Sequence, residues 1–159
     1  MKRTTAFMSV LLLAACGSPT PTAAPTTAPA STAPASTVCA AGVRTDPLPE
    51  WARAGFSGDS HPPYVLGARG DIAAILFGYP LAAPPRPDRS NKILWVSRLP
   101  LQPGSPLKIK ARMAGAGEPV LREVQPGPSI VDLPAAGCWH LYLSWSEHTD
   151  EIDLGYMAH

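Results

Sequence analysis

Charged side chains are scarce in this chain. Asp, Glu, Lys and Arg make up only 16% of its 159 residues, and the formal net charge is +1. Because Lys2 and Arg3 stand at the very start, the remainder carries eleven of the 13 basic residues against all 12 acidic ones. A body this close to neutral lacks the positive field that captures nucleic acid. We therefore expect no nucleic-acid partner.

Long hydrophobic runs are also missing. The apolar stretch from Ala6 to Leu13 is much shorter than the roughly 20 residues that a membrane-spanning helix needs. It follows the basic residues Lys2 and Arg3 and precedes small residues, an order typical of a cleaved export signal. We interpret residues 1–15 as a signal peptide, so the protein is expected to act outside the cytoplasm.

The predicted export signal ends at a cysteine. The segment Leu13-Ala14-Ala15-Cys16 resembles the lipobox of bacterial lipoproteins at all four positions. That resemblance implies a diacylglyceryl group on the sulfur of Cys16 and cleavage of the peptide bond before it; the alternative is a chance match inside an ordinary secretory signal. Each buried methylene contributes about 0.8 kcal/mol, so two or more acyl chains attach a protein lastingly. We expect a lipid anchor on the extracytoplasmic face of the cell membrane.

Large apolar side chains are absent from the segment that follows. Gly17 to Thr37 consists of 6 Thr, 6 Ala, 5 Pro, 3 Ser and 1 Gly. Such a segment cannot bury enough surface to offset the ordering of its backbone, so residues 16–37 are predicted to be a lipidated cysteine followed by a disordered linker. In an extended form the linker spans about 65 Å at most.

In residues 38–159 Pro and Gly recur often and interrupt helical patterns, which disfavours long helices; Leu48 to Phe56 is one weak helical candidate. The length suits one domain and excludes two. Leu107 to Met113 alternates apolar and basic residues, which predicts a strand with one wet face. Apolar runs on both faces predict interior strands at Asp71 to Tyr79 and Lys92 to Arg98. Further strands are predicted at Pro119 to Val124, Ser129 to Leu133, Cys138 to Trp145 and Glu151 to Tyr156, the last two joined by a five-residue loop, Ser146 to Asp150.

About seven short strands with closely spaced turn signals predict an all-β fold, an antiparallel immunoglobulin-like β-sandwich, with a small β-barrel as the alternative. The segment from Pro128 to Trp145, which includes Gly137-Cys138-Trp139, is similar to the closing strands of immunoglobulin-like domains in exported bacterial proteins. This resemblance implies fold and location and carries no catalytic residue.

Cysteines number only three. If Cys16 is lipidated, Cys39 and Cys138 remain as an even pair in an oxidising compartment, and we expect them to form a disulfide. If Trp139 and its alternate neighbours face the core, Cys138 points the other way, on the face of His140 and Tyr142. A bulge that turns Cys138 inward is the alternative.

Catalytic motifs are absent: the chain has no Gly-x-Ser-x-Gly, His-Glu-x-x-His or Cys-x-x-Cys. No cofactor is expected. Around the last predicted hairpin, imidazole and carboxylate groups are frequent enough to suggest a site for a metal or another ligand, although their spacing matches no known zinc or calcium motif. The candidate residues of this site are His140, Glu147, His148 and Asp150. A solvated polar hairpin is the simpler interpretation.

Taken together, these patterns predict a membrane-anchored cell-envelope lipoprotein whose sandwich is a non-catalytic binding or accessory module for an envelope protein or glycan. Two alternatives stay open, a small cell-wall or polysaccharide-acting enzyme and a metal-handling module. Aromatic residues, including Trp95, Trp139 and Trp145, are expected to fill the core rather than to line a ligand patch.

Overall fold

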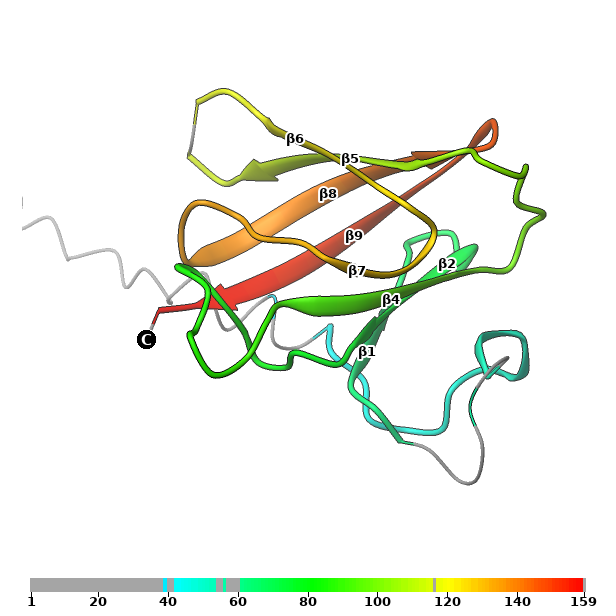
Figure 1. The fold of residues 1–159 in the computed structure, drawn as a ribbon, viewed down its shortest axis with the longest axis horizontal. Helices are drawn as coiled ribbons and strands as arrows, with labels where there is room; N and C mark the ends of the chain where they lie inside the picture. Colours follow the sequence, from blue (N-terminus) through cyan, green and yellow to red (C-terminus); the bar gives the residue numbers. More distant parts are fainter. Residues whose placement is uncertain (1–38, 40–41, 54–55, 57–60, 116, 159) are drawn as a thin grey trace, which may run out of the picture. The chain divides into compact units, whose positions relative to one another are not determined.

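The computed structural model describes residues 39, 42–53, 56, 61–115 and 117–158. Backbone contacts divide the chain at residue 31, and all described residues belong to the unit Thr32–His159. The predicted signal peptide, the lipobox with Cys16 and the linker lie outside the described residues. The described part contains one 3-10 turn and nine strands (Figure 1): η1 Glu50–Ala52, β1 Tyr64–Leu66, β2 Ile72–Leu76, β3 Leu81–Ala82, β4 Lys92–Ser97, β5 Leu107–Met113, β6 Val120–Val124, β7 Gly127–Ile130, β8 Gly137–Trp145 and β9 His148–Met157.

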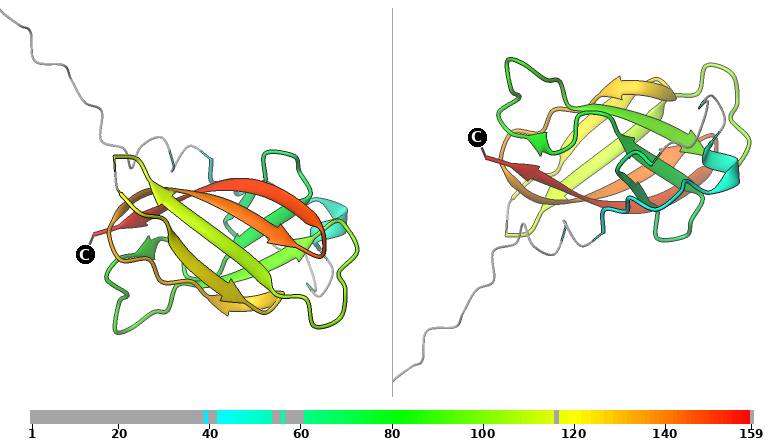
Figure 2. Two further views of the ribbon diagram at one scale, coloured as in Figure 1. Left: turned by 90° about the horizontal axis from the view of Figure 1, so that it is seen from above. Right: turned by 90° about the horizontal axis from the view of Figure 1, so that it is seen from below.

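These strands form two sheets that pack face to face (Figures 1 and 2), which confirms the predicted all-β sandwich. One sheet has the order β1-β2-β4-β7 and the other β3-β9-β8-β5-β6. No strand pairing joins the sheets among the described residues, so the fold is not a closed barrel. All pairs are antiparallel except β3 with β9. After β2 the chain crosses from the first sheet to the second, where β3 pairs with β9.

Alternating apolar residues of both sheets form the main core. In β5 the buried residues Leu107, Ile109 and Ala111 alternate with exposed basic ones, as the sequence predicts. Trp95, Trp139 and Trp145 are all buried in this core, which confirms their expected role. Each indole N–H has an acceptor: the Ser129 hydroxyl for Trp95, the Ala135 carbonyl for Trp139 and the Ser97 hydroxyl for Trp145. The large rings are therefore buried without leaving a polar atom unpaired.

A second, smaller apolar cluster covers the outer face of the four-stranded sheet. Leu48, Tyr64 and Ile75 are fully buried there, and Leu94 and Val96 pack against them. This cluster explains why β2 is buried on both faces and why β4 is apolar on both. Both strands lie in the interior of their sheet, as predicted.

Some elements differ from the sequence-based expectations. Of the weak helical candidate Leu48 to Phe56, the described residues form only the single turn η1, and Leu48 is buried in the outer cluster of the four-stranded sheet. Strands β1 and β3 were not expected; they have only three and two residues. The predicted strand Ser129 to Leu133 is shifted, since β7 begins at Gly127 and ends at Ile130.

The predicted five-residue hairpin loop is wrong. Trp145 pairs directly with His148, so only Ser146 and Glu147 form the turn. Both have positive φ, 43° and 70°, as a type I′ turn requires. Thr149 and Asp150 look like loop residues in the sequence, but they extend β9 because each pairs with a residue of β8.

Cys39 and Cys138 are joined by a disulfide, with their Cα atoms 5.7 Å apart, as predicted. Trp139 faces the core, so Cys138 lies on the outer face of the five-stranded sheet, and the predicted outward bond is confirmed over the alternative bulge. Cys138 pairs with Gly155 of β9, where an added Cβ would lie 3.3 Å from the Cβ of Cys39. The absence of a side chain at Gly155 thus makes room for Cys39, which is 1% exposed.

Candidate functional site

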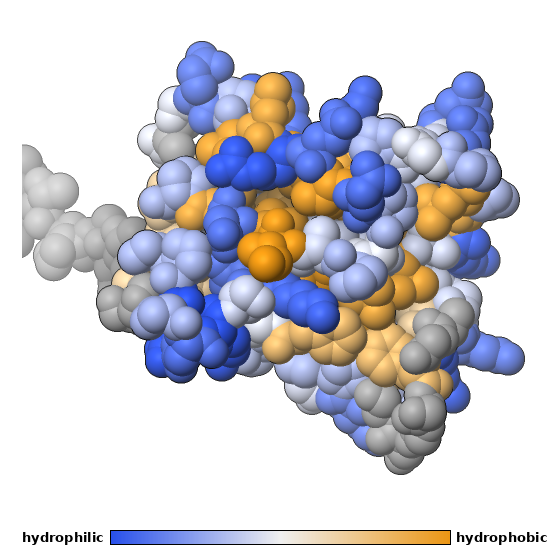
Figure 3. All heavy atoms as spheres, viewed as in Figure 1, coloured by the Kyte–Doolittle hydropathy of each residue, from blue (hydrophilic) through white to orange (hydrophobic). Residues whose placement is uncertain are grey.

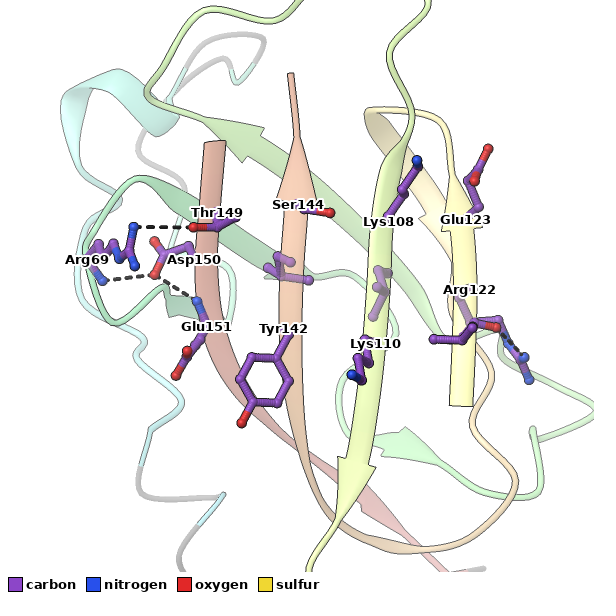
Figure 4. Close-up of a pocket in the computed structure, with 13 residues that line it drawn as sticks. Arg69, Lys108, Lys110, Arg122, Glu123, Tyr142, Ser144, Thr149, Asp150 and Glu151 are labelled. Atoms are coloured by element: carbon purple, nitrogen blue, oxygen red, sulfur yellow. Dashed lines mark hydrogen bonds between the residues drawn. The ribbon is translucent and has the colours of Figure 1, made fainter. Parts of the chain in front are cut away.

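An open groove of about 580 Å³ lies on the outer face of the five-stranded sheet. Its floor is formed by outward-pointing residues of β9, β8, β5 and β6, and Arg69 borders it at the β9 side (Figure 4). Because side chains alternate between the two faces of a strand, most residues of this floor have side chains that the core does not use.

The strand register places the floor residues in rows that cross the sheet. One row runs from Glu151 through Tyr142 and Lys110 to Leu121. A neighbouring row runs from Thr149 through Ser144 and Lys108 to Glu123. Carboxylates therefore stand at the two sides of the groove, while ammonium groups and an aromatic ring occupy its middle.

The middle of the groove is accessible. Tyr142 is 43% exposed and Leu121 67% exposed, the highest value among the large apolar side chains of the described residues. In Figure 4, Lys110 and Tyr142 extend side by side from β5 and β8 on the same face of the sheet. On the face seen in Figure 3, apolar side chains lie in separate patches divided by polar ones. An exposed ring beside two cations is a surface suited to ligand contact.

His140 holds the carboxylates of β9 and the ring of Tyr142 in place. Its Nδ1 lies 2.6 Å from an oxygen of Asp153, and its Nε2 lies 3.3 Å from an oxygen of Glu151. Both contacts join a ring nitrogen to a carboxylate oxygen, which can only accept a hydrogen bond. The imidazole also meets the ring of Tyr142 edge-on, with centroids 4.6 Å apart. This contact limits how the tyrosine ring can turn.

Asp150, a predicted ligand, instead has a structural role. Its side chain is 2% exposed and accepts hydrogen bonds from the backbone N–H groups of Arg69 at 2.9 Å, Asp71 at 3.1 Å and Glu151 at 2.8 Å. The carboxylate thus fixes the turn between β1 and β2. Its oxygens are occupied by these donors, so they do not offer an open position to a metal ion.

The four predicted ligand residues do not come together. His140 faces Asp153 and Glu151, Asp150 is turned to the β1–β2 turn, and Glu147 and His148 lie at the tip of the last hairpin. The ring of His148 packs near Trp145, with centroids 5.9 Å apart. Within the described residues, no group of three or more His, Cys, Asp or Glu side chains is placed to hold a metal ion.

Sequence reasoning missed the groove itself. The alternation in Leu107 to Met113 does place Lys108, Lys110 and Arg112 on one wet face, and the alternation after Cys138 places Tyr142 on the outer face. What the sequence does not reveal is that these two strands are neighbours. Only the sheet order brings the three cations beside the tyrosine.

The chain was compared with protein-family models, curated proteins and solved structures, and none of these comparisons gave a match. In the described part of the chain, no helix has the length and apolar character needed to cross a membrane. The fold and the groove together define a two-sheet sandwich with a polar, aromatic-lined outer face.

Proposed function

We propose that this protein is a membrane-anchored lipoprotein of the cell envelope and that its sandwich is a non-catalytic binding module. The lipid on Cys16 would hold it on the extracytoplasmic face of the membrane, and the groove would bind an envelope protein or glycan. The groove is the observation that carries the binding role: it is open, partly aromatic and bordered by charges.

Two features support the proposed location. The lipobox Leu13-Ala14-Ala15-Cys16 ends a signal-like segment, and the linker after it has the composition of a spacer. The disulfide between Cys39 and Cys138 fits an oxidising compartment, because disulfides persist mainly outside the cytoplasm. A non-catalytic role is favoured over the enzyme and metal alternatives since the charged side chains of the groove are spread across four strands rather than converging on one point.

The anchor is tested by metabolic labelling with a clickable fatty acid. The expected result is label on the wild-type chain, none on Cys16→Ser and full label on Cys39→Ala/Cys138→Ala. Equal label on wild type and Cys16→Ser, or no label on either, would refute the anchor.

The binding role is tested by site-specific photocrosslinking in intact envelopes. A photoreactive amino acid replaces Ser144 in the groove, and a matched one replaces Ile130, an exposed residue of the opposite sheet. We expect an envelope adduct from position 144 that is absent at position 130 and that is lost when Tyr142→Ala is added. The same adduct at both positions, or one that Tyr142→Ala leaves unchanged, would contradict a role for the groove.

A further inference from the structure

Although the total charge of the chain is close to neutral, basic and acidic side chains are separated from each other on the groove face. Three cations, Lys108, Lys110 and Arg112, project from alternate positions of β5 and are all exposed. Among the described residues, no ion pair joins any of them to a carboxylate. The carboxylates two strands away, on β9, are instead engaged by His140. Lys108 and Lys110 therefore have no carboxylate of the described part of the chain within ion-pair distance, although Glu123 stands opposite Lys108 on β6.

Like charges at every second residue of a strand stand about 7 Å apart and repel one another. An anion bound over β5 relieves that repulsion and gains charge-assisted hydrogen bonds from the lysines. Lys92, on the other sheet, shows a different arrangement, because its ammonium lies 5.7 Å from the centroid of the Phe77 ring. Lys92 is therefore a lysine outside the groove that has an aromatic partner of its own.

Apolar contacts flank the central lysine. In the strand register Lys110 stands between Tyr142 and Leu121, which are 43% and 67% exposed. His140 contacts the Tyr142 ring in a T-shaped arrangement, which restricts how the ring can turn and reduces the side-chain freedom that is lost on binding. A ligand ring with an apolar face and an anionic substituent fits this trio.

The flanking carboxylates narrow the choice of anion. Glu151 borders the groove at β9 and Glu123 at β6. Both accept hydrogen bonds from hydroxyl groups, which are frequent along a polysaccharide and scarce along a DNA backbone. A sugar ring with a carboxylate offers all three features: hydroxyl donors, an apolar ring face and a negative charge. The linker, Gly17 to Thr37, has no charged side chain and cannot supply the anion.

We propose that the groove binds an acidic polysaccharide, with sugar carboxylates on Lys108 and Lys110, a sugar ring on Tyr142, and hydroxyl groups donating to Glu151 and Glu123. Arg112 extends the cationic row toward His140 and contacts the next acidic unit of the chain. This inference rests on the proposed binding function and names its ligand class.

Calorimetric titration of the purified full chain in detergent tests it. The probe is an oligogalacturonate, and its methyl ester is the matched uncharged control. We expect heat of binding from the acid form, at least tenfold weaker binding by the ester, and weaker binding of the acid form as salt rises. Lys110→Gln should weaken binding of the acid form about tenfold, because one charge-assisted contact is lost. Tyr142→Ala should weaken it similarly, Tyr142→Phe should preserve it, and Lys92→Gln should leave it unchanged.

Three results would overturn the ligand assignment. These are equal binding of the acid and its ester, an equal loss in Lys92→Gln and Lys110→Gln, and tighter binding of polyphosphate, polyglutamate or anionic phospholipid vesicles than of oligogalacturonate. The crosslinking at position 144 is independent of these titrations. A groove-dependent adduct without oligogalacturonate binding refutes the acidic polysaccharide and keeps the binding function, whereas absence of any adduct from position 144 in the otherwise wild-type chain refutes the binding function itself.

Discussion

The carboxylate of Asp150 occupies the space that a side chain at Gly67 would need. A Cβ atom added at Gly67 would overlap the carboxyl group. Gly67 follows β1 in the four-stranded sheet, and Asp150 lies in β9 of the five-stranded sheet. The close approach lets Asp150 reach the backbone N–H groups of Arg69 and Asp71. One buried acidic side chain thereby connects the two sheets at this end of the sandwich.

Replacing Asp150 by Asn should lower the free energy of unfolding by about 2–3 kcal/mol. An amide offers a single acceptor oxygen and no charge, so backbone donors that Asp150 satisfies lose their partner. Urea denaturation measures the change. Glu147→Gln is the matched control, because the same chemical change at the exposed hairpin tip should alter stability by about 0.5 kcal/mol or less. Equal losses in the two variants would contradict the structural role of Asp150.

Gly67→Ala should destabilise the fold as well, by about 2 kcal/mol or more, because the added methyl group displaces the Asp150 carboxylate. If displacement is the cause, the double variant Gly67→Ala/Asp150→Ala should lose less stability than the sum of the two single losses. A double-mutant cycle in urea measures this coupling. Full additivity would show that the two positions act independently.

Removal of the disulfide should lower the free energy of unfolding substantially. The Cys39–Cys138 bond closes a loop with a sequence separation of 99, for which chain entropy predicts a loss of about 4.7 kcal/mol. The variant Cys39→Ala/Cys138→Ala should therefore unfold at a much lower urea concentration than the wild type. Reductant should lower the urea midpoint of the wild type toward that of the variant, and it should leave the midpoint of the variant unchanged. Cys16→Ser should keep wild-type stability, and a reductant effect on the double variant would reveal a different pairing.

Stability should fall at alkaline pH. Burial raises the pKa of the Tyr156 phenol, with a smaller contribution from Asp132, and the hydroxyl donates to the Val131 carbonyl at 2.6 Å. In the unfolded chain the phenol ionises near its ordinary pKa of about 10, while in the folded protein it stays protonated. Above that pH the unfolded state binds fewer protons than the folded state. The contribution of Tyr156 to the free energy of unfolding is therefore fully present below about pH 10 and decreases as the pH rises further. The urea midpoint should decline less steeply with pH above pH 10 in Tyr156→Phe than in the wild type. An identical slope in the two proteins would refute the assignment of the alkaline loss of stability to Tyr156.

Glu147→Gly should stabilise the protein by about 0.5–1 kcal/mol. Glu147 has a φ of 70°, which is unfavourable for a residue with a Cβ atom and free for glycine. Part of that gain is offset by the greater freedom of glycine in the unfolded chain. Glu147→Ala is the control, since it removes the carboxylate but keeps the strained backbone and should change little. A gain in both variants would assign the effect to charge instead of to the backbone.

Periodicity in the sequence was enough to predict the main strands and their faces. Alternation identifies β5, and apolar residues on both faces identify β2 and β4 as interior strands. The same alternation predicts that Cys138 points away from Trp139, which the disulfide on the outer face confirms. These predictions succeed because each depends only on neighbouring residues and on burial.

Features that depend on distant partners escaped prediction. Strand β3 has only two residues, and its pairing with Tyr156 and Met157 involves residues more than 70 positions away. Asp150 was read as a polar loop residue because nothing near it in the sequence indicates that Arg69 and Asp71 supply its hydrogen bonds. The groove likewise depends on β5 lying beside β8, which local patterning does not determine.

The position of the disulfide has a mechanical consequence for the anchored protein that we propose. Tension from the membrane would enter the described domain at Cys39 and pass through the sulfur bridge directly to Cys138 in β8. The same strand carries Tyr142, four residues further on, so a pull on a bound ligand would travel to the lipid along one strand and one covalent link. Strands β1 to β7 lie inside the closed loop and are spared this load, which lets the module resist stretching without unravelling.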